Sequence, residues 1–137
     1  SFCPSPLLRM GQLLAQAGPS QITHMRVAIV GAGSISREFA THHFGRPTGT
    51  VVSCIVDRDE KRAIGLAADV GSLQAGASVV GNNKYRSRAA EARGTPVPHF
   101  TELTNAALEN CDCVYVGTPP SMHAPFVLQA LAAGKHV

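Results

Sequence analysis

The sequence predicts an α/β fold, a doubly wound parallel sheet with helices on both faces, and three observations support this prediction. Short apolar runs alternate with segments of helical periodicity from residue 25 onward. The hydrophobic fraction of 45% is high and the charged fraction of 15% is low, as expected when the strands of a parallel sheet are buried on both faces. The length of 137 residues suits one such domain.

Residues 1–24 differ from the rest of the chain, because they contain three prolines, no Asp or Glu, and Arg9 as the only formal charge. Three interpretations are open: the remnant of a targeting peptide, a disordered extension, and sequence upstream of a true start at Met25. We expect a leader or disordered extension over 1–24, and a folded domain over 25–137.

The first predicted strand covers residues 26–30 and stops at Gly31. Gly33 follows after one residue, and a helical pattern begins at once with Ile35, Phe39 and Phe44. A side chain at either glycine would hold the backbone away from a diphosphate, whose charge is met by free N–H groups at a helix start. Position 36 is Ser where the dinucleotide-binding fingerprint has Gly or Ala, and Ser is still small enough for close helix–strand packing.

Turn residues 45–49 end this helix and lead to a second strand over residues 51–56, which Asp57 follows. A strand, a glycine turn, a helix and an acid after the next strand together predict a nucleotide-binding βαβ unit. The alternative is a βα turn without a ligand. Residues 57–62 form a charged helix entry, and Gly71 is the expected C-terminal stop of this helix. Its face toward the sheet is predicted to consist of Ala63, Leu66, Ala67 and Val70.

Residues 72–95 are an expected insertion, rich in Gly, Ala, Ser, Asn and Arg. We expect a surface excursion with a short helix around residues 86–93. One interpretation is a solvated loop. The more specific interpretation is a loop that folds over an anionic ligand and contacts it through Arg86, Arg88 or Arg93.

The βα alternation returns with a short strand at residues 97–100, whose Pro98 suits an edge or a strand start. Thr101 is the expected N-cap of a helix that ends at residues 110–112. Residues 113–116 predict the next buried strand. The apolar face of the helix before it is predicted to consist of Leu103, Ala107 and Leu108.

After a sharp turn at residues 117–120, residues 122–133 predict the last helix, with Gly134 as its stop. Residues 135–137 look like the start of another strand. The inward side chains of this helix are expected to be Phe126, Val127, Ala130 and Leu131.

Composition argues against several classes of function. The net charge of +3 is spread along the chain without a basic block, so nucleic-acid binding is not expected. No apolar run approaches the roughly 20 residues needed to span a membrane. Metal binding is not expected either, because the cysteines lack the spacing of zinc or redox motifs. We expect them to be free thiols in a reducing, cytoplasmic compartment. Import into an organelle is the alternative if residues 1–24 are a targeting remnant. The cysteines are Cys3, Cys54, Cys111 and Cys113.

Three pieces of the chain form a distinctive set: residues 27–35, residues 56–58, and residues 116–123 together with 133–137. The third is the most specific, since a Thr-Pro beyond a buried strand is followed by a His and, after one helix, by Gly-Lys-His-Val. On these motifs, residues 25–137 resemble the nicotinamide-binding domain of the glucose-fructose oxidoreductase / inositol 2-dehydrogenase family (Gfo/Idh/MocA type). The family often has Asn where this chain has Pro120. The resemblance implies a Rossmann-type sheet, here truncated before its last strands.

The resemblance also implies a cofactor site. Backbone N–H groups of the glycine turn would cradle the pyrophosphate, and Asp57 would accept hydrogen bonds from the adenosine ribose hydroxyls. An acid at this position disfavours NADP, because a 2′-phosphate would meet a like charge, so NAD is expected and NADP is possible. Arg58 could stack on adenine or pair with that phosphate. The turn residues are Gly31, Ala32, Gly33, Ser34 and Ile35; Thr118, Pro119, Pro120 and His123 would lie on the nicotinamide-ribose side.

No catalytic residue is expected in this chain. Family members move a hydride between the nicotinamide and a hydroxyl-bearing carbon, usually on a sugar or cyclitol, and a lysine with a second-domain histidine handles the proton. That lysine lies beyond Gly-Lys-His-Val and is not Lys135. The C-terminal substrate domain, often the dimer interface, is likewise expected to be absent.

We therefore expect the cofactor-binding domain of an NAD(P)-dependent oxidoreductase acting on a sugar, polyol or related alcohol. The full-length form is expected to be a homo-oligomer, and this chain alone to bind cofactor without turnover. The alternatives are a non-catalytic regulatory nucleotide-binding module, a truncated product, and another Rossmann enzyme such as a methyltransferase. The Thr-Pro-Pro-x-x-His piece counts against the last of these.

Overall fold

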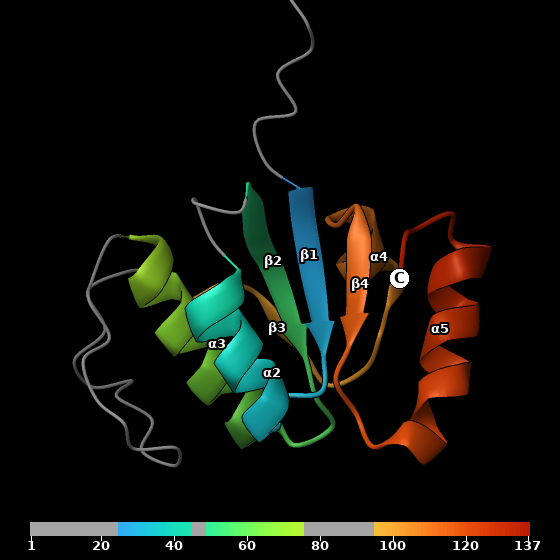
Figure 1. The fold of residues 1–137 in the computed structure, drawn as a ribbon, viewed down its shortest axis with the longest axis horizontal. Coiled ribbons are helices and arrows are strands. Elements are labelled where there is room, and N and C mark those ends of the chain that lie inside the picture. The colour runs from blue at the N-terminus through green and yellow to red at the C-terminus, as the bar shows by residue number, and fades with distance from the viewer. Residues whose placement is uncertain (1–24, 45–48, 76–94) are drawn as a thin grey trace, which may run out of the picture.

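The structure, a computed structural model, describes residues 25–44, 49–75 and 95–137 (Figure 1). The expected leader, turn residues 45–48, and the expected insertion from residue 76 to 94, with its short helix and three arginines, lie outside the described residues.

A parallel sheet forms the centre of the domain, with the strand order β3-β2-β1-β4. This order places the first strand in the middle, which is the arrangement of a doubly wound Rossmann-type fold, so the predicted fold class is confirmed. The strands are β1 (Met25–Val30), β2 (Thr50–Val56), β3 (His99–Phe100) and β4 (Cys113–Val116).

The expected further strand at residues 135–137 is present as one parallel bridge. His136 pairs with Cys113 on the outer edge of β4. The Val114 N–H donates to the His136 carbonyl at 2.8 Å, and the His136 N–H donates to the Asp112 carbonyl at 3.2 Å. A fifth strand position is therefore begun beside β4.

Helices cover both faces of the sheet because the side chains of each strand alternate between the faces. On one face, Val27 and Ile29 pack with the π-helical turn η1 and with α3, and α2 lies on the same side. On the other face, Ala28 and Val30 pack with α4 and α5 (Figure 1). The helices are α2 (Ser34–Glu38), η1 (Phe39–His43), α3 (Glu60–Gln74), α4 (Asn105–Glu109) and α5 (His123–Ala132), which a 3-10 turn, η4 (Pro120–Met122), precedes.

Two helix boundaries differ from the prediction. Gly71 does not stop α3, which continues to Gln74; it lies in the helix interior, where a Cβ would be 2.2 Å from the Thr95 carbonyl oxygen. The glycine serves close backbone packing rather than a turn. The N-cap of α4 is Thr104 rather than Thr101, because the Thr104 hydroxyl accepts the Ala107 N–H at 3.3 Å.

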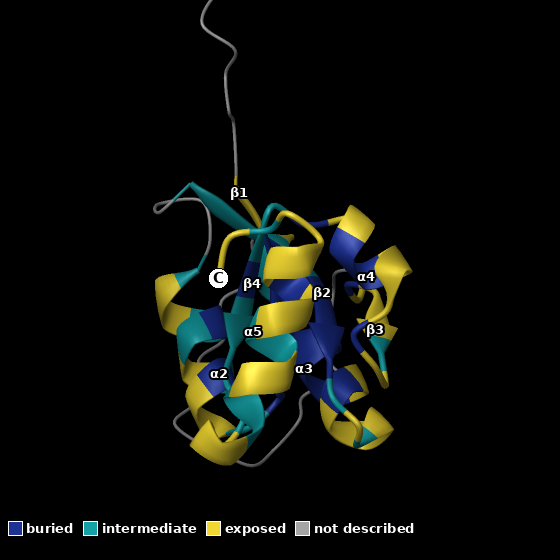
Figure 2. Cartoon of the chain, turned by 90° about the vertical axis from the view of Figure 1, so that its right-hand side faces the viewer, coloured by how far each residue is buried: buried dark blue, intermediate teal, exposed yellow. Residues whose placement is uncertain are grey.

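The last helix, α5, buries fewer of its apolar side chains than predicted. Ala130 is fully buried and Phe126 and Val127 are half-buried, whereas Leu131 is 55% exposed. Figure 2 shows the broad exposed side of α5. The predicted inward position of Leu131 is therefore wrong. Leu131 lies outward because α5 packs mainly against β4 at the border of the sheet, so only one side of the helix meets the protein. Gly134, at φ +72°, is the predicted stop.

Candidate functional site

The carboxyl ends of β1, β2 and β4 meet at one edge of the sheet, where their arrowheads point in Figure 1. Gly31 follows β1, Asp57 follows β2, and Gly117 and Thr118 follow β4. In open α/β sheets, ligands bind outside this edge, at the point where the strand order reverses. The fold thus brings the glycine turn, Asp57 and the segment after β4 together, whereas His136 of the third motif piece lies at the other end of β4, beside Cys113.

The turn after β1 requires glycine at Gly31. Its φ of +92° is a conformation that residues with a side chain rarely adopt, and its N–H donates to the Val56 carbonyl at 2.7 Å. A Cβ there would lie 3.0 Å from the Gly117 carbonyl carbon and 3.0 Å from both N and Cγ2 of Thr118. The turn is therefore packed directly on the segment after β4.

The start of α2 presents free backbone donors. Gly33 is the N-cap without a side-chain cap, and its carbonyl accepts the Arg37 N–H at 3.0 Å. None of the described residues accepts the N–H of Gly33, Ser34 or Ile35, which are among the orphan donors of a helix start. A Cβ on Gly33 would meet nothing within 4 Å, so the space beside the Gly33 Cα is open.

Two of the five predicted turn residues use their N–H groups inside the protein. The Gly31 N–H is taken by Val56, and the Ala32 N–H donates to Asp57 Oδ2 at 2.7 Å. The donors left for an anion are therefore those of Gly33, Ser34 and Ile35.

The Asp57 carboxylate lies at this turn and is held by backbone contacts. Oδ2 accepts the Ala32 N–H, Oδ1 accepts the Asp59 N–H at 2.8 Å, and the Asp57 N–H donates to the Phe100 carbonyl at 3.0 Å. A carboxylate has about four acceptor positions, so each oxygen retains capacity for a hydroxyl donor. Arg58, the next residue, is exposed before α3 begins.

On the predicted nicotinamide side, a histidine makes a hydrogen bond to the turn after β4. His123 Nε2 lies 2.6 Å from the Thr118 carbonyl oxygen, and because that oxygen only accepts, Nε2 carries the hydrogen. His123 thereby ties the start of α5 to the turn. Pro119 and Pro120 are exposed, and the Thr118 hydroxyl is buried without a hydrogen-bond partner among the described residues.

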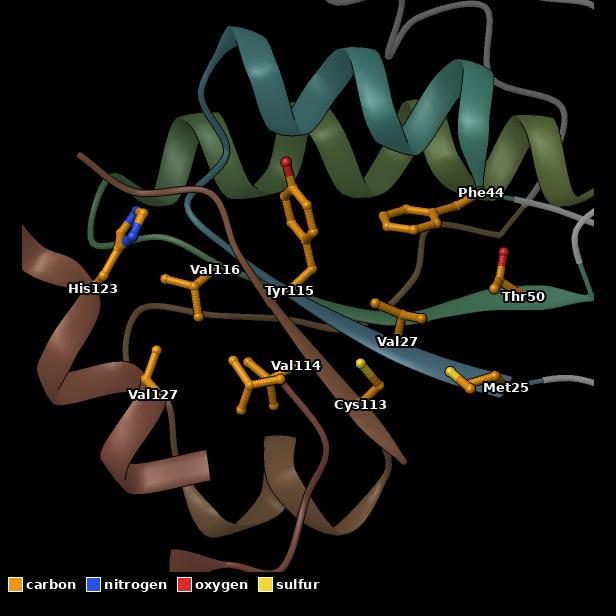
Figure 3. Close-up of a pocket in the computed structure, with 11 residues that line it drawn as sticks. Met25, Val27, Phe44, Thr50, Cys113, Val114, Tyr115, Val116, His123 and Val127 are labelled. Atoms are coloured by element: carbon orange, nitrogen blue, oxygen red, sulfur yellow. The ribbon is translucent and has the colours of Figure 1, made fainter. Parts of the chain in front are cut away.

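A hollow of about 410 Å³ lies along the outer edge of β4, away from the glycine turn (Figure 3). Its lining is mostly apolar, with Tyr115 and Phe44 toward α2 and Val127 on α5. His123 is the one residue of the predicted cofactor site in this lining. The hollow follows the strand edge that His136 begins to cover.

The described cysteines, Cys54, Cys111 and Cys113, are unpaired. Burial raises the pKa of Cys54 to about 11 and also raises the pKa values of Cys111 and Cys113. Because the thiolate is the reactive form, these thiols are not activated nucleophiles at neutral pH. Among the residues that the structure describes, no group of His, Cys, Asp and Glu side chains could hold a metal ion, and no helix there is long and apolar enough to cross a membrane.

Sequence reasoning missed Gly117 as a residue of this site. A Cβ on Gly117 would lie 2.0 Å from Ser36 Oγ, so the backbone directly after β4 packs against the Ser36 side chain on α2. The signal was a glycine directly after a buried strand and before Thr-Pro. Ser36 itself is fully buried, in agreement with the predicted close helix–strand packing.

Comparisons with known proteins support the family and the fold. A family model described as "Oxidoreductase family, NAD-binding Rossmann fold" matches residues 25–137. A glycosyl hydrolase family 109 protein of Shewanella amazonensis is 29% identical over 119 residues, which are 85% of this chain and 22% of that protein. An inositol 2-dehydrogenase of Corynebacterium glutamicum is 27% identical over 111 residues, 80% of this chain and 26% of that protein. The chain thus spans about a quarter of the length of these relatives.

Solved structures show the same fold. GenD2 from gentamicin A biosynthesis, in complex with NAD, has a TM-score of 0.55 at 22% identity over 98% of this chain and 28% of its own. An oxidoreductase from Agrobacterium radiobacter, in complex with NAD⁺, L-tartaric acid and magnesium, has a TM-score of 0.50 at 20% identity, over 82% of this chain and 26% of its own.

Proposed function

The chain belongs to the oxidoreductase family with an NAD-binding Rossmann fold, and we propose that residues 25–137 bind NAD at the carboxyl edge of the sheet. One observation carries the proposal: the N–H groups of Gly33, Ser34 and Ile35 have no acceptor among the described residues, and the space beside the Gly33 Cα is open. Backbone donors at a helix start suit a pyrophosphate, whose oxygens are acceptors and carry negative charge. This fit is a property of the backbone and needs no charged side chain.

The preference for NAD over NADP is proposed to depend on Asp57. Its backbone contacts fix the carboxylate at the turn, and the remaining lone pairs suit the two ribose hydroxyls of adenosine. A 2′-phosphate would instead meet a fixed negative charge. Arg58 is exposed beside it and is proposed to stack on adenine, while pairing with a 2′-phosphate would favour NADP.

The nicotinamide-ribose side is proposed to lie along Thr118, Pro119 and Pro120. His123 would hold this segment in place through its hydrogen bond to the Thr118 carbonyl. When bound, the nicotinamide supplies hydride chemistry, and the described residues supply its binding and orientation.

For the whole protein we propose NAD(P)-dependent oxidation or reduction of a sugar, polyol or related alcohol, in a homo-oligomer. The relative named inositol 2-dehydrogenase supports this substrate class. The proton-transferring residues and the substrate-holding domain are proposed to lie outside residues 25–137, so the domain alone would bind cofactor without turnover.

The test is a thermal melt of the chain with NAD or NADP, for the wild type and for Gly33→Ala. A ligand that binds only the folded state adds RT ln(1 + [L]/Kd), about 2.7 kcal/mol at a hundredfold excess over Kd. Gly33 has φ −75°, which alanine adopts, and its Cβ meets nothing, so the variant should fold normally. Its methyl group would stand where the pyrophosphate is proposed and should abolish the NAD shift.

Ile64→Ala, an exposed position on α3, is the matched control and should keep the NAD shift. A cooperatively melting wild type that responds to neither nucleotide would refute the proposal. So would a Gly33→Ala variant that binds NAD like the wild type.

A further inference from the structure

The contact between α2 and the end of β4 is unusually close. Ser36 lies in α2 three residues after Gly33, is fully buried, and its Oγ has no hydrogen-bond partner among the described residues. Gly117 directly follows β4, and its N–H donates to the Val30 carbonyl at 2.8 Å. The two residues thus connect the helix after β1 with the segment after β4.

Gly117 leaves no room for a side chain. A Cβ on Gly117 would lie 2.0 Å from Ser36 Oγ, 3.3 Å from Ser36 Cβ and 2.9 Å from Tyr115 Cε1. Gly31, in the turn after β1, also lies close to the segment after β4: a Cβ on Gly31 would lie 3.0 Å from the Gly117 carbonyl carbon. Real Cβ atoms essentially never show contacts below 3.0 Å, so a Cβ on Gly117 requires a shift of the Ser36 and Tyr115 side chains or of the segments that carry them. Ser36 is fully buried, so its hydroxyl has little room to rotate away, and we expect the segments to separate.

We propose that Gly117 and Ser36 form a spacer that sets the distance between the glycine turn with α2 and the segment after β4, with Gly117 as a positioning residue for the dinucleotide. This inference rests on the proposed function, since the two segments that they join are the proposed pyrophosphate turn and the proposed nicotinamide-ribose segment, Thr118–Pro120. A dinucleotide is a covalent ligand of fixed length that must contact both segments at once. A ligand that ends at the diphosphate contacts only the turn and Asp57.

The spacer therefore predicts a selective defect. Moving the segment after β4 away from α2 weakens the binding of NAD, because the nicotinamide half loses its contacts or strains the rest. It leaves the binding of ADP unchanged, because the donors of Gly33, Ser34 and Ile35 and the Asp57 carboxylate do not belong to the displaced segment. A general loss of stability would not separate the two ligands.

The experiment is titration calorimetry of NAD and ADP with the full chain, for the wild type, Gly117→Ala, and Ser36→Ala/Gly117→Ala, each at a temperature where a melt shows it folded. Gly117→Ala is expected to lose about tenfold in NAD affinity, equivalent to about 1.4 kcal/mol, with ADP affinity unchanged. The double variant removes the 2.0 Å contact with Ser36 Oγ and leaves the 2.9 Å contact with Tyr115 Cε1, so it should recover part of the NAD affinity. Ile64→Ala serves as the exposed control.

Unchanged NAD affinity in a folded Gly117→Ala would overturn the spacer, and so would an equal loss for both ligands without recovery in the double variant. If Gly117→Ala does not fold, Ser36→Thr takes its place, since its added methyl group presses on the same contact from the helix side. A loss of NAD affinity is expected there, and unchanged NAD affinity overturns the proposal. A wild type that binds neither ligand refutes the proposed function instead.

Discussion

Asp57 combines the proposed ribose contact with a structural role that its sequence position does not reveal. Its carboxylate accepts the Ala32 N–H at 2.7 Å and the Asp59 N–H at 2.8 Å, and Ala32 is buried. A buried donor without an acceptor costs the desolvation of that group. The residue therefore stabilises the glycine turn before any cofactor arrives.

Asp57→Ala should thus lower the free energy of unfolding by about 1–3 kcal/mol without ligand, besides weakening NAD binding. Urea denaturation of the ligand-free protein measures the first effect, and titration calorimetry on the folded variant measures the second. Arg58→Ala, at the exposed neighbouring position, should leave the ligand-free stability unchanged. Equal unfolding curves for wild type and Asp57→Ala would contradict the structural role.

Asp112 supports a prediction about pH. The Arg26 backbone N–H and guanidinium donate to its carboxylate at 2.9, 3.3 and 2.9 Å, and these contacts lower the pKa of Asp112 to about 2. Because the pKa is depressed in the folded state, the stabilisation is complete above the ordinary carboxyl pKa near 4 and is lost as the pH falls toward 2.

Asp112→Asn should therefore be less stable than the wild type at pH 6, and the difference should disappear between about pH 4 and pH 2. Urea midpoints at several pH values measure this difference, with Glu109→Gln, at an exposed position on α4, as the charge-matched control. The effect should be small, since both partners are about half-exposed. A difference that is constant with pH would show that the carboxylate charge is not the cause.

At the scale of elements, α3 and the segment after it pack at backbone distance. A Cβ on Gly71 would lie 2.2 Å from the Thr95 carbonyl oxygen and 2.9 Å from the Pro96 Cα, and the Val97 N–H donates to the Ala67 carbonyl at 3.2 Å. Both sides of this contact are backbone, so neither can move aside by a change of rotamer.

Gly71→Ala is expected to destabilise the protein by about 1–3 kcal/mol, because the segment at residues 95–97 must shift. Helix propensity alone predicts the opposite sign, a gain of about 1 kcal/mol for alanine over glycine inside a helix. The sign of the change in a urea melt therefore distinguishes the two effects. A more stable variant would mean that the segment yields easily.

The strands were the elements that the sequence predicted best. Residues 113–116 match β4, and the strand predicted at 51–56 begins one residue earlier, at Thr50. Uninterrupted apolar runs bounded by turn residues are typical of buried parallel strands, and this signal needs no knowledge of tertiary contacts. At the site, the pattern also predicted the meeting of the glycine turn with Asp57, because the carboxyl ends of parallel strands share one edge.

The errors have a common cause, which is that local signals do not report tertiary contacts. Thr101 and Thr104 are both acceptable N-caps, and only the path of the chain selects Thr104. Glycine is common at helix C-termini, which is why Gly71 was predicted as a stop, but here it lies in the close contact between α3 and residues 95–96. Leu131 has helical spacing with the buried residues, yet the sheet does not extend far enough to cover it.

At the scale of the whole molecule, the strands of the sheet are covered unevenly by helices and by neighbouring strands. β1 and β2 lie inside the sheet with helices on both faces, whereas the outer edge of β4 carries only the bridge to His136 among the described residues. Beside this edge lies the apolar hollow of about 410 Å³, and α5 exposes Leu128 at 67% and Leu131 at 55% (Figures 2 and 3). Apolar surface next to an unpaired strand edge favours association with other chains.

The 137-residue chain is therefore expected to self-associate. Sedimentation velocity between micromolar and millimolar concentration should show species larger than a monomer, and Leu128→Glu/Leu131→Lys should shift the distribution toward the monomer. Both positions are exposed, so the double variant should melt like the wild type. Ile64→Glu, an exposed apolar position on α3 and away from this edge, should leave the association unchanged. If the wild type is a monodisperse monomer over this range, or if Ile64→Glu dissociates it equally well, the α5 and β4 border is not the surface that associates.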